Sequence, residues 1–298
     1  MSRARTLVAS DLDRTLIYSV RALELTEPDR RAPRLLTVET YQSQPQSYLT
    51  ETAAGLLAAL ATDPRAVFVP TTTRTPEQYL RVRLPGPPPR YAICANGGQL
   101  LVDGVADQDW HRAVRGRLAA ECAPLDEVRA RIRATADPAW LLRDRVAEDL
   151  FAYLVVDRER LPETWLATFA EWAAPLGWTV SLQGRKLYAV PAPLTKSAAV
   201  AEVARRAGTD RTLAAGDSLL DRDLLLAADL AWRPGHGELA TSGWTAPHVV
   251  GLAERGVSCG ESILRALLAA LPPAAADVAD GPAPTAVPVP GPPAATPR

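Results

Sequence analysis

Short apolar runs alternate with longer segments of helical periodicity along most of the chain. Residues 195–208 form one helical pattern, in which apolar residues recur on one face between a Thr195 cap and Gly208, and residues 261–271 form another. The apolar runs have the length and the polar boundaries of buried strands, and they cover residues 6–10, 66–70, 91–95, 212–216 and 229–232. This order predicts an α/β fold with a Rossmann-like parallel sheet and helices on both faces.

The alternation breaks between residues 108 and 184. Two helical patterns (110–121 and 124–136) precede an alternating segment (150–156), a further helix (162–174) and a strand (178–182). Four of the seven tryptophans lie here and Trp110 lies at its edge, so the segment can form an apolar core of its own. We therefore predict a discontinuous core domain (1–107 and 185–271) with a smaller α+β domain (108–184) inserted into it.

Composition narrows the class of protein. The chain has 298 residues, 47% of them apolar and 22% charged, as in soluble globular proteins, and its net charge of −1 does not favour nucleic acid or an anionic membrane. The three cysteines are an odd number without metal-type spacing. We expect them to be small buried hydrophobic residues in a reducing compartment. No signal-peptide core or membrane span is visible, so we expect a cytoplasmic protein. The Pro-rich segment 272–298 predicts a disordered tail, inert or a weak ligand for a protein partner.

Polar residues follow the predicted strands where each one ends. Since the carboxyl ends of parallel strands meet at one edge of a sheet, we expect these side chains to converge there. The groups are Asp11, Asp13 and Thr15 after the first strand, Thr71 to Arg74 after the second, Asn96 to Gly98 after the third, and Asp217, Ser218 and Asp221 after the fourth, with Lys196 opening the preceding helix.

Each group has a purely structural alternative. A D-x-D sequence can be a turn, a run of threonines can cap a helix, and Lys196 can be a solvated helix residue. The segment Gly216–Asp221 can be a turn followed by a capped helix. Their joint placement at one sheet edge favours a site over these alternatives.

These motifs resemble those of the haloacid dehalogenase (HAD) superfamily of phosphohydrolases. The D-x-D-x-T motif stands at residues 11–15, the Ser/Thr motif fits Thr72, the lysine fits Lys196, and G-D-x-x-x-D stands at residues 216–221. The insert after Asn-Gly is similar to the cap of the large-cap subfamily, which includes Cof-type and sucrose-phosphate phosphatases. The chain also resembles actinobacterial HAD hydrolases without a settled substrate.

The resemblance implies a magnesium-dependent phosphatase of a small phosphorylated metabolite, such as a sugar phosphate. Asp11 would be the nucleophile that forms an aspartyl-phosphate, and Asp13 the general acid and base. Thr72 and Lys196 would bind phosphate. Mg²⁺ would be held by Asp11, Asp217 and the backbone carbonyl of Asp13, and Asp221 would orient the metal or its waters. A phosphomutase of the same fold, and a non-catalytic binding protein that recruits a partner through the tail, are the alternatives.

Further residues are candidates for substrate contacts, and some positions depart from the family. Arg185 and Lys186 are expected at the return from cap to core, His236 follows the fifth strand, and Arg74 and Asn96 lie beside the motifs. His236 has an alternative as a loop histidine. Arg14 stands where many members have Gly, and Leu220 where Cof-type members have Asn. The stretch 18–48 is longer than the usual flap and could fold over the site.

Overall fold

The central sheet is parallel and consists of strands that the apolar runs predict, with one addition. A computed structural model describes residues 5–273, and its five-stranded sheet has the order β14-β13-β12-β1-β4 with all neighbours parallel. The strands are β1 (Thr6–Ser10), β4 (Ala66–Pro70), β12 (Arg211–Ala215), β13 (Leu230–Arg233) and the additional β14 (Val249–Gly251). Every residue of β1 and β4 is buried, as expected for strands covered on both faces.

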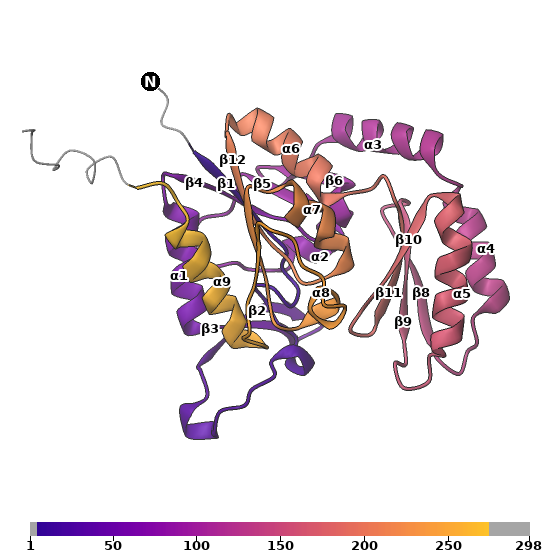
Figure 1. Cartoon of the computed structure of the whole chain (residues 1–298), viewed down its shortest axis with the longest axis horizontal. Coiled ribbons are helices and arrows are strands. Elements are labelled where there is room, and N and C mark those ends of the chain that lie inside the picture. Colours follow the sequence, from indigo (N-terminus) through magenta and orange to yellow (C-terminus); the bar gives the residue numbers. More distant parts are fainter. Residues whose placement is uncertain (1–4, 274–298) are drawn as a thin grey trace, which may run out of the picture.

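Helices cover both faces of this sheet, which confirms the predicted fold class. On the face of Val8, α1 (Glu51–Thr62) and α9 (Val257–Ala269) form one apolar cluster with the sheet. On the face of Leu7 and Ala9, the cluster includes residues of α6 (Lys196–Ala207), α7 (Arg222–Ala227) and α8 (Gly237–Thr241). Figure 1 shows the two groups of helices on opposite sides of the strands.

The strand predicted at 91–95 lies in a different sheet. β5 (Tyr91–Cys94) pairs with β6 (Gln99–Val102), which pairs with β7 (Val105–Ala106), and both pairings are antiparallel. An isolated parallel bridge between Thr71 and Ile93 joins this sheet to the end of β4. The loop that follows β5 therefore still reaches the carboxyl edge of the main sheet.

The long stretch after Ile17 contains a β-hairpin that the apolar pattern did not reveal. Strands β2 (Leu35–Tyr41) and β3 (Gln44–Thr50) pair antiparallel, with irregularities in register around Glu39. Two short 3₁₀ helices, Val20–Ala22 and Asp29–Arg31, precede the hairpin. We call residues 18–50 the flap. The short helix α2 (Pro76–Leu80) follows β4.

The inserted domain is a four-stranded antiparallel sheet with helices on one side. The sheet order is β10-β11-β9-β8, with β8 (Leu141–Ala147), β9 (Phe151–Val156), β10 (Trp178–Gln183) and β11 (Lys186–Pro191). Helix α3 (Gln108–Glu121) leads into it, and α4 (Leu125–Thr135) and α5 (Glu163–Ala173) lie on its outer side, away from the central sheet (Figure 1). Trp165 stacks on Phe169, so the aromatic residues form the core of this cap, as expected.

The cap extends further along the chain than the predicted end at residue 184. β11 pairs with both β10 and β9, so it is an inner strand of the cap sheet rather than part of the core domain. Gly184 lies at the tip of the β10–β11 hairpin. The error has a physical cause: five of the six residues of β11 are buried, so the run lacks the alternation that marks a half-buried strand.

Two further predictions concern termini and membranes. The predicted tail (272–298) lies almost wholly outside the described residues. Within residues 5–273, no helix combines the length and the apolar character that crossing a membrane requires.

Candidate active site

The sequence motifs meet at the carboxyl edge of the central sheet. Asp11 follows β1 and its backbone N–H donates to the carbonyl of Ala215 at the end of β12. Thr72 follows β4, and Asp217 follows β12. Lys196 is the first residue of α6. The convergence predicted from strand ends is thus present in the structure.

Lys196 is completely buried and lies between two carboxylates. Its Nζ donates to Oδ1 of Asp11 at 2.6 Å and to Oδ1 of Asp221 at 2.5 Å. Burial favours the neutral amine, but the two carboxylates outweigh it and raise the pKa of Lys196. Lys196 is therefore a cation at the centre of the site, and the interpretation as a solvated helix residue is wrong.

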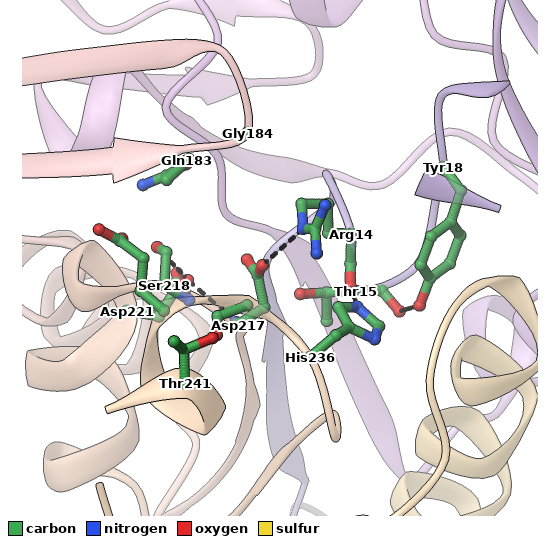
Figure 2. A network of polar contacts seen from close by, with 12 residues as sticks. Arg14, Thr15, Tyr18, Gln183, Gly184, Asp217, Ser218, Asp221, His236 and Thr241 are labelled. Atoms are coloured by element: carbon green, nitrogen blue, oxygen red, sulfur yellow. Dashed lines mark hydrogen bonds and ion pairs between the residues drawn. The ribbon is translucent and has the colours of Figure 1, made fainter. Parts of the chain in front are cut away.

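Asp221 is held rigidly by its own loop. Its Oδ2 accepts hydrogen bonds from Ser218 Oγ at 2.7 Å and from the backbone N–H groups of Ser218 and Asp217 at 2.9 and 3.2 Å. Figure 2 shows these contacts beneath the cap residues Gln183 and Gly184. The neighbouring Leu220 is buried in the apolar cluster of the cap, so the departure from Asn replaces a polar group with a hydrophobic contact.

Asp11, Asp217 and Asp221 form a cluster that suits a hard divalent cation. One carboxylate oxygen from each lies within 4.8 Å of the others. Burial raises the pKa of Asp11 to about 7 despite the opposing effect of Lys196, with Asp221 adding to the rise, and burial and Asp11 also raise the pKa of Asp217. Lys196 and Arg14 supply two positive charges against three buried carboxylates, and oxygen ligands of this kind fit Mg²⁺.

Arg14 provides a second cation at this cluster. Its Nε donates to Oδ2 of Asp217 at 3.2 Å (Figure 2). Its backbone has a φ of 66°, the left-handed region that Gly adopts most easily. Here Arg14 adopts that conformation, and its guanidinium lies beside Asp217.

His236 binds the backbone of Arg14 through a hydrogen bond. The Gly256 N–H donates to Nδ1 of His236 at 3.1 Å, so Nε2 carries the proton and donates to the carbonyl of Arg14 at 2.7 Å. The residue is 2% exposed, and burial lowers the pKa of its ring. With both ring nitrogens bound to backbone, His236 is a positioning residue, not the substrate contact we expected.

Thr72 and Asn96 also lie in the buried wall of the site. Thr72 Oγ1 accepts a hydrogen bond from the Arg74 N–H at 3.1 Å, which leaves its hydroxyl hydrogen free for another acceptor. Asn96 Nδ2 donates to the carbonyl of Leu194 at 2.8 Å, two residues before Lys196. Asn96 thus fixes the start of α6, and it does not line the cavity described below.

Arg74 binds Asp13 and the flap together. Its Nε and Nη2 donate to the two carboxylate oxygens of Asp13, and its Nη1 donates to Oε2 of Glu39 at 2.8 Å. Ser47 Oγ also donates to Glu39, at 2.7 Å. Burial alone would raise the pKa of Asp13, but the Arg74 guanidinium outweighs it and lowers this pKa to about 2. Asp13 is therefore ionised.

A cavity of about 650 Å³ opens between the core, the flap and the cap hairpin. Arg74, Arg185 and Lys186 line it, so these three candidates for substrate contacts do come together. Sequence reasoning missed Glu39 and Arg158, which also line it. The strand-like residues and polar turn in 35–50 could have indicated a hairpin, but no local pattern identifies Arg74 as the partner of Glu39.

The cap is held over this cavity by polar contacts to the core. Oε2 of Glu238 in α8 accepts from Ser181 Oγ, and its Oε1 accepts from the Leu182 N–H at 2.7 Å. Gln78 Nε2 donates to Tyr153 Oη at 3.3 Å on the opposite side. These contacts place the tip of the β10–β11 hairpin above the acidic cluster.

Solved structures of phosphatases share this architecture. The sucrose-phosphatase of Synechocystis sp. PCC6803, in complex with sucrose and phosphate, matches with a TM-score of 0.60 at 14% identity over 90% of this chain and 98% of that one. A HAD phosphatase from Bacteroides thetaiotaomicron matches with a TM-score of 0.51 at 15% identity over 90% and 96% of the two chains. A HAD subclass IIB sugar phosphatase matches with a TM-score of 0.51 at 12% identity over 89% and 98%.

Neither a family model nor a curated protein matches the chain. At these sequence identities the structural matches show the fold alone. This fold agrees with the four motifs on which the resemblance rests. The chain has the fold of the HAD-superfamily phosphatases, with an antiparallel cap inserted into the Rossmann-like core.

Proposed function

We propose that the protein is a magnesium-dependent phosphatase that hydrolyses a small phosphorylated metabolite through an aspartyl-phosphate. The observation that carries this proposal is the contact of the buried Lys196 with both Asp11 and Asp221, beside Asp217. A buried lysine between these carboxylates can bind a phosphoryl oxygen, and it opposes the effect of burial on the pKa of Asp11. The shared fold with a sucrose-phosphatase supports the same conclusion.

The metal would be held by Asp11, Asp217 and Asp221 together with the backbone carbonyl of Asp13. When bound, Mg²⁺ would supply positive charge to the phosphate oxygens and so reduce their repulsion of a carboxylate. The cluster fits this ion because its ligands are hard oxygens from buried carboxylates with a deficit of positive charge.

Asp11 would then attack phosphorus with the oxygen that Lys196 does not hold. A bond forms between this oxygen and phosphorus, and the bond from phosphorus to the leaving oxygen breaks. Lys196 and the free hydroxyl hydrogen of Thr72 would stabilise the phosphoryl oxygens, whose charge is the main obstacle to transfer.

Asp13 would move the protons. It would protonate the leaving oxygen in the first step, and in the second it would take a proton from the water that attacks the aspartyl-phosphate. Its contact with Arg74 supports the second role directly, because an ionised carboxylate is a base. The same contact opposes the first role until the guanidinium moves away from Asp13.

The test is the Asp11→Asn variant with an aryl phosphate and Mg²⁺. Turnover should fall by about 10⁴-fold or more, since the nucleophile is lost. Wild-type enzyme quenched in acid during turnover should carry one acid-stable, alkali-labile phosphoryl group, and the variant none. Asp210→Asn, at an exposed acid, is the matched control and should keep wild-type turnover. Substantial turnover by Asp11→Asn would refute the mechanism.

A further inference from the structure

The cavity above the proposed site has a large excess of positive charge. Seven arginine and lysine side chains line it, against two carboxylates. Like charges gathered at one surface repel one another, so such an excess is costly unless an anion neutralises it. The distribution of ion pairs shows which of the cations are available to a ligand.

Three of the cations already have carboxylate partners. Arg74 binds both acidic residues of the cavity, Asp13 and Glu39, and Arg81 lies 3.6 Å from Glu39. Arg14 pairs with Asp217 of the acidic cluster. Both carboxylates that line the cavity therefore pair with Arg74, and Asp13 also interacts electrostatically with Lys186, so two carboxylates face seven cations.

The other four cations, Arg21, Arg158, Arg185 and Lys186, form no ion pair with any carboxylate among residues 5–273. They come from three separate segments: Arg21 from the flap, Arg158 from the loop after β9, and Arg185 and Lys186 from the tip of the β10–β11 hairpin. We call these four residues the cationic rim.

Two members of the cationic rim are oriented by the cap backbone. Arg158 Nη1 donates to the carbonyl of Gly184 at 3.1 Å, and Arg185 Nε donates to the carbonyl of Val156 at 3.5 Å. Each guanidinium is thus anchored to the neighbouring loop by one N–H. A carbonyl carries no net charge, so the remaining N–H groups and the positive charge stay available to a ligand.

We infer that the leaving group of the substrate carries a second anionic group, a carboxylate or another phosphate, which the cationic rim binds. This inference rests on the proposed function, in which Lys196 and the metal neutralise the transferred phosphoryl group. The cationic rim is therefore available to bind the rest of the substrate. A volume of about 650 Å³ suits a small metabolite rather than a macromolecule.

The experiment compares phosphate esters that differ only in this second charge. Wild-type enzyme with Mg²⁺ is given glycerol 3-phosphate against 3-phosphoglycerate for a carboxylate, and fructose 6-phosphate against fructose 1,6-bisphosphate for a phosphate. Phenyl phosphate serves as the common reference. We expect kcat/KM to be about tenfold or more higher for the doubly anionic member of at least one pair, because a charge-assisted contact is gained. The pair that shows the preference identifies the anion.

Variants connect the preference to the cationic rim. In the double variant Arg158→Gln/Lys186→Gln, the ratio of kcat/KM for the preferred ester to that for phenyl phosphate should fall by about tenfold or more, chiefly through KM. Arg160→Gln, two residues from Arg158 and outside the cavity lining, should leave the ratio unchanged. The ratio should also fall with rising ionic strength, because salt screens charges at an open cavity.

The outcomes separate the two claims. Hydrolysis of phenyl phosphate with no preference in either pair, or a ratio that the double variant does not change, would overturn the inference and leave the proposed function standing. No hydrolysis of any ester would refute the proposed function, and the inference would fall with it.

Discussion

The carboxylate of Glu238 in the core accepts a hydrogen bond from the hydroxyl of Ser181 in the cap, with 2.6 Å between Oε2 and Oγ. The same oxygen accepts from the Leu219 N–H at 3.1 Å, in the loop between Asp217 and Asp221. One side chain therefore joins the cap strand β10 to the loop that carries two carboxylates of the candidate site.

Replacing Glu238 with Gln should loosen the cap. The amide has one accepting oxygen instead of two and no charge, so at least one of its contacts to Ser181, Leu182 and Leu219 is lost. We expect kcat/KM for an aryl phosphate to fall by about tenfold, because a charge-assisted hydrogen bond contributes roughly 1.5–3 kcal/mol. Hydrogen exchange should become faster at the Leu182 amide. Glu171→Gln, at an exposed cap residue, is the control, and unchanged exchange in Glu238→Gln would contradict the prediction.

The ionised state of Asp13 leads to a kinetic prediction. Asp13→Asn removes the base for the second step, so the phosphorylated enzyme should accumulate. With p-nitrophenyl phosphate, whose leaving group needs no proton, the first turnover should give a burst of one product per enzyme. Steady turnover should then be slower than wild type by about 10²–10⁴-fold. Loss of activity without a burst would instead place the defect before or at the attack by Asp11.

Magnesium should stabilise the fold more strongly at high pH than at low pH. The pKa of Asp11 is raised from 3.8 to about 7, so its protonated form stabilises the metal-free fold at low pH, and this contribution is lost as the pH rises through about 7. The metal requires the ionised carboxylates. The rise in Tm on adding Mg²⁺ to chelator-treated protein should therefore be larger at about pH 8 than at about pH 5.

Asp11→Asn provides the comparison for this measurement. The amide cannot ionise, so the Tm of the metal-free variant should depend less on pH than that of the wild type. Equal magnesium-induced shifts at both pH values, in wild-type protein, would show that the acidic cluster does not hold the ion.

Gly216 should not tolerate a side chain. A Cβ at this position would lie 2.4 Å from Cβ of Asp221, which cannot move away without breaking its contacts with Ser218 and Lys196. Gly216→Ala should lower both the activity and the Tm. Gly55→Ala is the matched control, because Gly55 lies in α1 with nothing within 4 Å of the added Cβ. It should stabilise the protein by about 0.5–1 kcal/mol.

The sequence predicted the central sheet and the convergence of the motifs because both depend on local patterns. Buried parallel strands appear as continuous apolar runs, and their carboxyl ends lie at one edge whatever the order of the strands. The positions of Asp11 and Asp217 followed from that rule, whereas Lys196 opens a helix and was assigned to the site with the other motifs. The resemblance to HAD phosphohydrolases added the expectation of a cap, and the antiparallel sheet at 141–191 agrees with it.

Other features depend on contacts between distant segments, which local patterns do not reveal. The pairing of Arg74 with Glu39 joins residues 35 positions apart, and nothing near either residue indicates it. β11 was missed because five of its six residues are buried, so it lacks the alternation of a half-buried strand. His236 was expected to contact the substrate, since the sequence could not show that both of its nitrogens bind backbone groups.

Arg74 binds Asp13 and Glu39 and also donates to Ser47 Oγ at 3.2 Å, which has a consequence for the local stability of the chain. Arg74 and Glu39 are both buried, so a partial opening that separated them would leave buried charges without their partners. The flap hairpin therefore cannot open by a small local fluctuation, and its opening would also free Glu39 and expose the guanidinium that holds Asp13. The flap and the D-x-D loop should protect their amides from exchange as one cooperative unit, so the hairpin is part of the folded core of the site and not a mobile cover.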